Sequence, residues 1–168
     1  MSKKNIAVLG AGKMGLGIAQ LFATKGHQVK VIYVYDDKIR CDAAAVVRSN
    51  LSVLVENDVM TQQEADDAAA RISFVDTIEE VADFADIVFE GIIEKLEIKQ
   101  DYFAKMDAIF PVSTILATNT SAISITEIAE KSVHKERIIG THYWNPAYLV
   151  PLVEVIKTKY VSDETVQA

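Results

Sequence analysis

The sequence predicts a doubly wound α/β domain, in which helices cover both faces of a mostly parallel sheet. Short apolar runs alternate along the chain with longer segments of helical periodicity. A glycine-rich loop separates the first apolar run from the first helical segment. Half of the 168 residues are apolar, which suits one packed core, whereas the chain is short for two domains. We therefore expect a single domain over residues 1–168.

The first half of the chain is expected to hold four strands and three long helices. Strands are predicted where short runs are rich in apolar and β-branched residues, at 5–9, 28–35, 72–75 and 87–90. Helices are predicted from helical spacing and from start and stop signals, at 14–25, 39–56 and 62–70. Thr61 with Glu64, and Thr77 with Glu80, have the spacing of capping boxes that begin a helix.

The second half continues the alternation of strands and helices. Strands are expected at 114–117, 138–143 and 152–156, and a helix with one apolar face at 96–110. Ser124 with Glu127 has the spacing of a third capping box, which would begin a helix at 125–131. The segment SDETV after Tyr160 has the composition of a further helix start.

The overall composition excludes several classes of function. A net charge of −7 and a pI near 4.9 argue against a nucleic-acid partner, because phosphate binding requires an excess of Lys and Arg. Cys41 is the single cysteine, and no His or Cys pair has the spacing of metal ligands, so neither a disulfide nor a metal site is expected. No run approaches the roughly twenty apolar residues of a membrane span. We expect a cytoplasmic protein without membrane contact.

The glycine-rich loop predicts a dinucleotide site. Gly10, Gly12 and Gly15 form the pattern GxGxxG, with Lys13 and Met14 between the last two glycines, directly after the first strand and at the start of the first helix. In this context the glycines allow a tight turn, close approach of a pyrophosphate and close helix packing. A purely structural glycine turn is the alternative.

An acidic residue about twenty positions after such a loop commonly binds the adenosine ribose of NAD. Asp36, which is 21 residues after Gly15, has that spacing. It could instead belong to a solvated turn, and the nearby Lys38 and Arg40 leave NADP open as the cofactor.

A proton-transfer site is predicted where strands end, because ligands of open α/β sheets bind at the carboxyl ends of strands. His142 could act as a base, Ser121 could hold a substrate oxygen, and Glu154 could orient the imidazole. Glu154 lies between apolar residues in LVEVI, where an unpaired buried carboxylate would be costly. A structural histidine, a serine at a helix entry and a glutamate on an edge strand facing water are the alternatives.

Four segments together resemble one known family. They are VLGAGKMGLGIAQLFATKGHQV, EKLEIKQDYF, ATNTSAISITEIA and GTHYWNPAYLVPLVEVI. They are similar to the NAD-binding domain of L-3-hydroxyacyl-CoA dehydrogenases, including bacterial 3-hydroxybutyryl-CoA dehydrogenases, and the similarity covers essentially the whole chain. The resemblance implies a Rossmann-type domain that binds NAD and oxidises the 3-hydroxyl of an L-3-hydroxyacyl-CoA to give a 3-oxoacyl-CoA.

The resemblance also implies roles for individual residues. His142 would be the general base, paired with Glu154, while Ser121 would bind the substrate oxygen. Asn145 would line the nicotinamide and substrate site. Cofactor contacts are implied at both Ser121 and Asn145, and also at Glu94 and Lys99.

Members of this family have a second, helical domain that provides most of their dimer contact. The resemblance implies that residues 157–168 begin the link to such a domain and that the domain itself is absent here. The full-length protein would then be a homodimer, and the fragment alone would have little activity. The sequence leaves three other functions open: a dehydrogenase of a small hydroxy acid such as gulonate or carnitine, a dinucleotide-sensing module without catalysis, and an S-adenosylmethionine methyltransferase.

Overall fold

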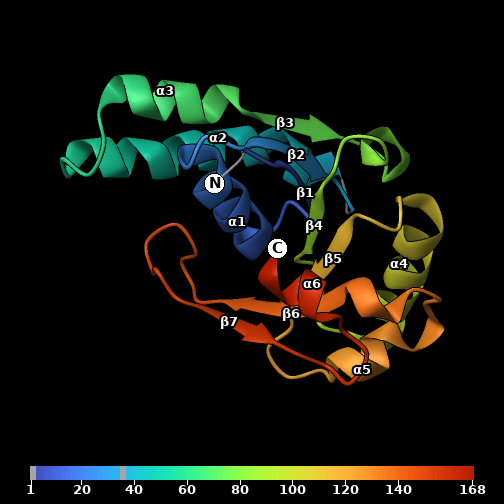
Figure 1. Cartoon of the computed structure of the whole chain (residues 1–168). Helices are drawn as coiled ribbons and strands as arrows, with labels where there is room; N and C mark the ends of the chain where they lie inside the picture. Colours follow the sequence, from blue (N-terminus) through green and yellow to red (C-terminus); the bar gives the residue numbers. More distant parts are fainter. Residues whose placement is uncertain (1–2, 35–36) are drawn as a thin grey trace.

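The predicted architecture is confirmed by a computed structural model, which describes residues 3–34 and 37–168, with side chains left out at 37–41. Asp36 therefore lies outside the described residues. Within them, seven strands form one sheet in the order β3-β2-β1-β4-β5-β6-β7 (Figure 1). Strands β1 to β6 pair in parallel, and β7 pairs antiparallel with β6. This is the doubly wound, Rossmann-type arrangement with one antiparallel edge strand.

The elements have the following bounds. The strands are β1 (Asn5–Leu9), β2 (Gln28–Ile32), β3 (Ile72–Val75), β4 (Ile87–Glu90), β5 (Ile115–Thr118), β6 (Ile138–Tyr143) and β7 (Val153–Ile156). The α-helices are α1 (Lys13–Thr24), α2 (Asp37–Glu56), α3 (Gln62–Ala70), α4 (Leu96–Ile109), α5 (Ile125–Ile128) and α6 (Asp163–Gln167). Short 3-10 turns are η1 (Glu79–Val81), η2 (Ala129–Lys131) and η3 (Lys135–Arg137).

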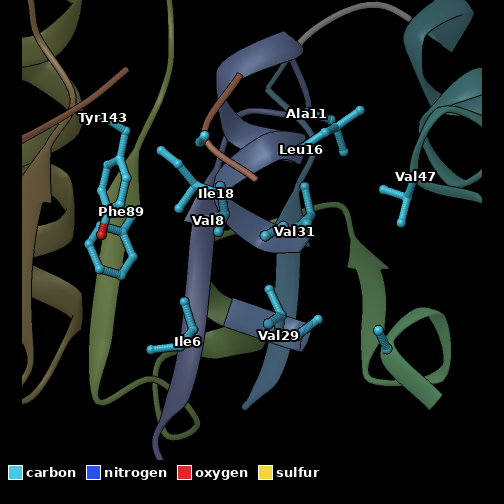
Figure 2. Close-up of a cluster of buried hydrophobic side chains, with 14 of the residues drawn as sticks. Ile6, Val8, Ala11, Leu16, Ile18, Val29, Val31, Val47, Phe89 and Tyr143 are labelled. Carbon is cyan, nitrogen blue, oxygen red and sulfur yellow. The ribbon is translucent and has the colours of Figure 1, made fainter. Parts of the chain in front are cut away.

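The core has two halves, one on each face of the sheet. Helices α1, α2 and α3 pack on the first face, where Leu16, Val47 and Ala65 join the inward side chains of β1 and β2 (Figure 2). Helices α4 and α5 pack on the second face through residues such as Phe103 and Ile128. Successive strand residues alternate between the two clusters, as the period of two in a strand requires. The buried sheet therefore fixes where every strand end lies.

Most predicted boundaries agree with the structure to within two residues, but three predictions were wrong. The helix predicted at 125–131 ends at Ile128 and continues only as the 3-10 turn η2. Strand β2 ends at Ile32 rather than at residue 35. There the Ile32 carbonyl accepts a hydrogen bond from the Gly10 amide, because the chain has reached the level of the glycine loop. The capping box at Thr61 and Glu64 is present, whereas the Ser124 side chain makes no cap bond. Instead, the backbone carbonyl of Ser124 accepts from the Glu127 amide.

Strand β7 is the most exposed strand of the sheet. All four of its residues are exposed, including Val155 and Ile156, because it lies at the edge of the sheet and pairs on one side only. Nearby, Trp144, Leu149 and Leu152 are exposed as well. This strand nevertheless lies directly beside β6, which bears His142. Among the described residues, none of the helices combines the length and the apolar character that a bilayer crossing requires.

Candidate functional site

The glycine loop has the backbone that the sequence pattern predicts. Gly10 has a φ of +106°, which favours glycine, and a Cβ there would press on the carbonyl of Gly91. A Cβ at Gly15 would collide with the carbonyl oxygen of Gly10, so the third glycine is required by the close approach of α1 to the loop. The first and third glycines therefore shape the turn itself.

Gly12 is different, because a Cβ at this position would meet no protein atom within 4 Å. Its φ of −77° is open to any residue, and no side chain caps the start of α1. Gly12 and Lys13 are exposed, and Met14 is half-buried. The absence of a side chain thus leaves space in front of the first helical amides, which is where a pyrophosphate would be bound. The loop fits a dinucleotide.

Ser121, His142 and Glu154 are brought together at the carboxyl end of the sheet, and we call them the proton-handling site. Ser121 Oγ lies 3.0 Å from His142 Nε2, and His142 Nδ1 lies 2.6 Å from Glu154 Oε2. The carboxylate can accept the Nδ1 proton, which leaves Nε2 to interact with the serine hydroxyl. The predicted convergence of these side chains is therefore confirmed.

The sheet places these three residues by strand ends and by register. Ser121 follows β5, and the side-chain oxygen of Asn119 in the same loop accepts from the Tyr143 amide at 2.8 Å. His142 and Glu154 are direct partners in the antiparallel β6–β7 ladder. Antiparallel partners point to the same face of a sheet, so their side chains meet although 12 residues separate them.

The expectation that Glu154 is a buried acid was wrong. Its side chain is 52% exposed, compared with 23% for His142. The apolar neighbours of Glu154 in LVEVI belong to an edge strand that is exposed along its length. Glu154 is thus both the imidazole partner and an edge-strand residue in contact with water.

Glu94 and Lys99 belong to a second group of polar residues, which we call the Lys99 cluster: Glu90, Glu94, Lys99, Thr118 and Thr120. Lys99 Nζ lies 2.6 Å from Glu90 Oε1 and 3.2 Å from Glu94 Oε2. The Lys99 side chain is 1% exposed, so any influence on a cofactor would pass through Glu94, which is 42% exposed. Glu90 is the last residue of the strand predicted at 87–90, and neither its burial nor its bond to Lys99 was predicted.

Glu94 joins the Lys99 cluster to the proton-handling site. Its Oε1 accepts hydrogen bonds from the Thr120 hydroxyl and from the Ser121 amide, the latter at 3.1 Å. Partial burial tends to raise the pKa of Glu94, but the Thr120 hydrogen bond and the Lys99 charge outweigh it and hold the pKa below its usual range. Glu94 is therefore an ionised acceptor at neutral pH.

The remaining predicted residue is Asn145, which follows β6 and is exposed. Its peptide bond to Pro146 is cis. No hydrogen bond joins its side chain to the three residues of the proton-handling site. The described side chains contain no group of three or more His, Cys, Asp or Glu residues arranged to hold a metal ion.

Comparisons with known proteins give the family. The model of the 3-hydroxyacyl-CoA dehydrogenase NAD-binding domain matches residues 5–168. A probable 3-hydroxybutyryl-CoA dehydrogenase of Bacillus subtilis is 41% identical over 167 residues, which are 98% of this chain and 57% of the relative. The chain thus spans little more than half of that relative's length.

Solved structures agree with this result. The 3-hydroxybutyryl-CoA dehydrogenase of Escherichia coli superposes with a TM-score of 0.93 at 35% identity, over 99% of this chain and 35% of that one. A 5-formyl-3-hydroxy-2-methylpyridine 4-carboxylic acid 5-dehydrogenase superposes with a TM-score of 0.85 at 30% identity, over 99% of this chain and 52% of that one. The glycine loop, the converging polar residues and the match over nearly all of the sequence lead to one conclusion: this chain belongs to the 3-hydroxyacyl-CoA dehydrogenase family and represents its NAD-binding domain.

Proposed function

We propose that this chain is the cofactor-binding and proton-handling part of an NAD-dependent L-3-hydroxyacyl-CoA dehydrogenase. The single observation that supports this most strongly is the hydrogen-bonded series from Ser121 through His142 to Glu154. Oxidation of an alcohol needs a group that removes the hydroxyl proton and a partner that stabilises the charge so formed. Relatives named 3-hydroxybutyryl-CoA dehydrogenase support the substrate class.

The residues divide the work as follows. His142 Nε2 takes the proton of the substrate 3-hydroxyl, and the Glu154 carboxylate, bonded to Nδ1, stabilises the imidazolium. Ser121 Oγ, now 3.0 Å from Nε2, is close enough to hydrogen-bond the substrate oxygen as well. When NAD is bound it supplies the hydride acceptor, and Asn145 lines the site beside it.

Several residues would hold the cofactor. The space at Gly12 and the exposed start of α1 receive the pyrophosphate, with Gly10 and Gly15 shaping the turn and Lys13 and Met14 providing the first helical amides. Asp36, which lies outside the described residues, would bind the adenosine ribose and favour NAD over NADP. Glu94, held by Lys99, would contact the cofactor from the loop after β4.

The biological setting completes the proposal. The protein acts in fatty acid metabolism, in the cytoplasm, without nucleic acid or membrane as partner. Its full-length form has a further helical domain that follows residues 157–168 and forms a homodimer, and the chain alone turns substrate over slowly.

A pair of matched glycine variants tests cofactor binding. Gly12→Ala and Gly26→Ala lie at the two ends of α1, and a Cβ at Gly12 would meet no protein atom within 4 Å. We expect Gly12→Ala to melt like the wild type but to weaken NADH binding at least about tenfold, or roughly 1.4 kcal/mol. Gly26 has a φ of +88°, so Gly26→Ala should lower the stability and leave NADH affinity unchanged.

Fluorescence titration with NADH and NADPH measures these affinities, and thermal unfolding measures the stabilities. Unchanged NADH affinity in Gly12→Ala would contradict the pyrophosphate site. A preference of the wild type for NADPH of about tenfold or more would contradict the assignment of Asp36, since a ribose carboxylate repels the additional phosphate.

A dehydrogenase of a substrate without coenzyme A is the second candidate, and the structural relative that acts on a pyridine carboxylic acid favours it. The two are distinguished by following NADH oxidation with acetoacetyl-CoA and with acetoacetate. We expect the reaction with acetoacetyl-CoA alone, and we expect His142→Gln to abolish it without changing NADH affinity. Turnover of acetoacetate alone would favour the second candidate.

A further inference from the structure

Glu90 is a fully buried carboxylate at the carboxyl end of β4. Three donors from three different elements bond to it. Its Oε1 accepts from Lys99 Nζ at 2.6 Å and from the Ile92 amide at 2.7 Å, and its Oε2 accepts from Thr118 Oγ1 at 2.6 Å. Glu90 thereby joins α4, the loop after β4 and the end of β5.

The chain of contacts continues from Glu90 to the proton-handling site. Lys99 Nζ lies between the two carboxylates of Glu90 and Glu94. Glu94 in turn accepts from the Ser121 amide, and Ser121 Oγ contacts His142. Every link in this path is a hydrogen bond or an ion pair.

Burial makes the inner part of this path stiff. A buried ammonium group is stable only when it is paired, so Lys99 cannot leave Glu90 without a large cost. Glu94 is 42% exposed and could otherwise turn toward water. The fixed position of the Lys99 ammonium therefore determines where the Glu94 carboxylate, and with it the backbone of Ser121, is held.

We propose that Glu90 is a positioning residue of the dehydrogenase site, which acts through Lys99 and Glu94 to hold Ser121 in hydrogen-bonding reach of His142. Because Glu90 is fully buried, we assign it no contact with substrate or cofactor. The inference rests on the proposed function, because it gives a role to Glu90 in the same site.

Glu90 also lies close to the glycine loop. Leu9 and Glu90 are register partners in β1 and β4, and the Gly91 amide donates to the Leu9 carbonyl at 2.9 Å. A Cβ at Gly91 would lie 3.3 Å from the Gly15 nitrogen. Glu90 is thus adjacent to Gly91, against which the predicted pyrophosphate loop packs, so one residue can align both parts of the site.

Two buried threonines provide a matched test. Thr118 Oγ1 donates to Glu90, whereas Thr114 Oγ1 donates to the Ala85 carbonyl at 2.8 Å, at the other end of β5. Both side chains are buried, and each makes one such bond. Thr118→Val and Thr114→Val should therefore lower the melting temperature to a similar degree. Only Thr118→Val removes a donor from Glu90.

The positioning is measured by nuclear magnetic resonance on the 168-residue chain. We expect the Ser121 amide signal and the His142 ring signals to move in Thr118→Val and to stay in place in Thr114→Val. Glu90→Gln keeps the side-chain shape but removes the charge, and it should move the same signals further. NADH binding should weaken by about threefold or more in Glu90→Gln, or roughly 0.7 kcal/mol, and remain unchanged in Thr114→Val.

The proposal is overturned if the Ser121 and His142 signals stay in place in Thr118→Val, or if Thr114→Val moves them equally. Thr118→Val alone decides the matter if Glu90→Gln does not fold. Failure of the proposed function gives a different result in the wild-type chain, which would then either not bind NADH or not reduce acetoacetyl-CoA, while the comparison of signals could still be made.

Discussion

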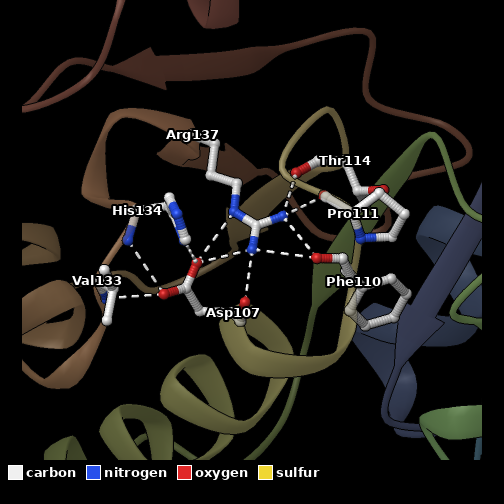
Figure 3. A network of polar contacts seen from close by, with 7 residues as sticks. All are labelled: Asp107, Phe110, Pro111, Thr114, Val133, His134 and Arg137. Carbon is white, nitrogen blue, oxygen red and sulfur yellow. Dashed lines mark hydrogen bonds and ion pairs between the residues drawn. The ribbon is translucent and has the colours of Figure 1, made fainter.

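Two pairs of side chains that can carry opposite charges lie at opposite ends of the strands of the sheet. At the amino ends of the strands, Asp107 of α4 and Arg137 just before β6 form a buried ion pair, with both side chains 3% exposed (Figure 3). At the carboxyl ends of the parallel strands, the side chains of His142 and Glu154 are 23% and 52% exposed. The contact distances are similar, 2.7 Å and 2.6 Å, so distance alone does not distinguish the two pairs.

The difference lies in how many other partners each pair has. Arg137 donates to Asp107 and to the backbone carbonyls of Phe110, Pro111 and Thr114. Oδ2 of Asp107 accepts from the Val133 and His134 amides. Such saturation suits a pair that holds α4 to the start of β6.

The titration of Asp107 reflects the same saturation. Burial tends to raise the pKa of Asp107, but the His134 amide, the Arg137 guanidinium and the Val133 amide hold it below its usual range. His142 and Glu154 instead have the serine hydroxyl and water beside them, which leaves room for a reacting group. The proton-handling site is therefore open on one side, as the proposed function requires.

The largest effect on stability is expected from Asp107, at the amino ends of the strands. Asp107→Ala removes the carboxylate and leaves the Arg137 guanidinium buried without its partner, which should cost about 3–5 kcal/mol of the free energy of unfolding. Urea unfolding at pH 7 measures it. NADH affinity of the folded protein should be unchanged. A loss of affinity without a loss of stability would contradict the structural role of the Asp107–Arg137 pair.

An intermediate effect on stability is expected from Tyr143, which lies beside His142 on β6 but faces the core. Burial raises the pKa of its phenol to about 12. Because the folded pKa is above the ordinary value of about 10, the stabilisation is complete below pH 10 and is lost as the pH rises toward 12, by up to about 3 kcal/mol. Tyr143→Phe should therefore lose less stability than the wild type between these pH values. Equal alkaline loss in both proteins would show that the phenol is solvated.

The smallest effect on stability is expected from Glu154→Gln. An exposed ion pair contributes little, so the free energy of unfolding should change by less than about 1 kcal/mol. The same change should nevertheless reduce NADH-linked turnover, because the amide cannot balance the charge on His142. A stability loss as large as that of Asp107→Ala would remove the contrast between the two pairs.

The pattern of the sequence was sufficient for the sheet and for the convergence of the site. Residues at the carboxyl ends of neighbouring parallel strands must lie near one another, so Ser121 and His142 could be placed together from their positions after β5 and near the end of β6. The glycine loop was equally predictable, because backbone conformation at Gly10 and close packing at Gly15 allow little else.

Burial of charged residues was not predictable in the same way. Lys99 has the appearance of a surface residue on an amphipathic helix, and only the neighbouring strand ends make it a buried partner of Glu90. Asp107 and Arg137 are 30 residues apart, and no local periodicity relates them. The exposure of Glu154 depends on β7 lying at the edge, which its apolar neighbours in sequence do not reveal.

The antiparallel register of β7 has a consequence for mutations that delete a residue. His142 faces Glu154 only because the two strands pair in this one alignment. A slip by one residue would bring Val153 or Val155 opposite the imidazole and turn the acid to the other face. Loss of a single codon within this strand would thus separate His142 from Glu154 while Ser121, His142 and Glu154 are all still encoded.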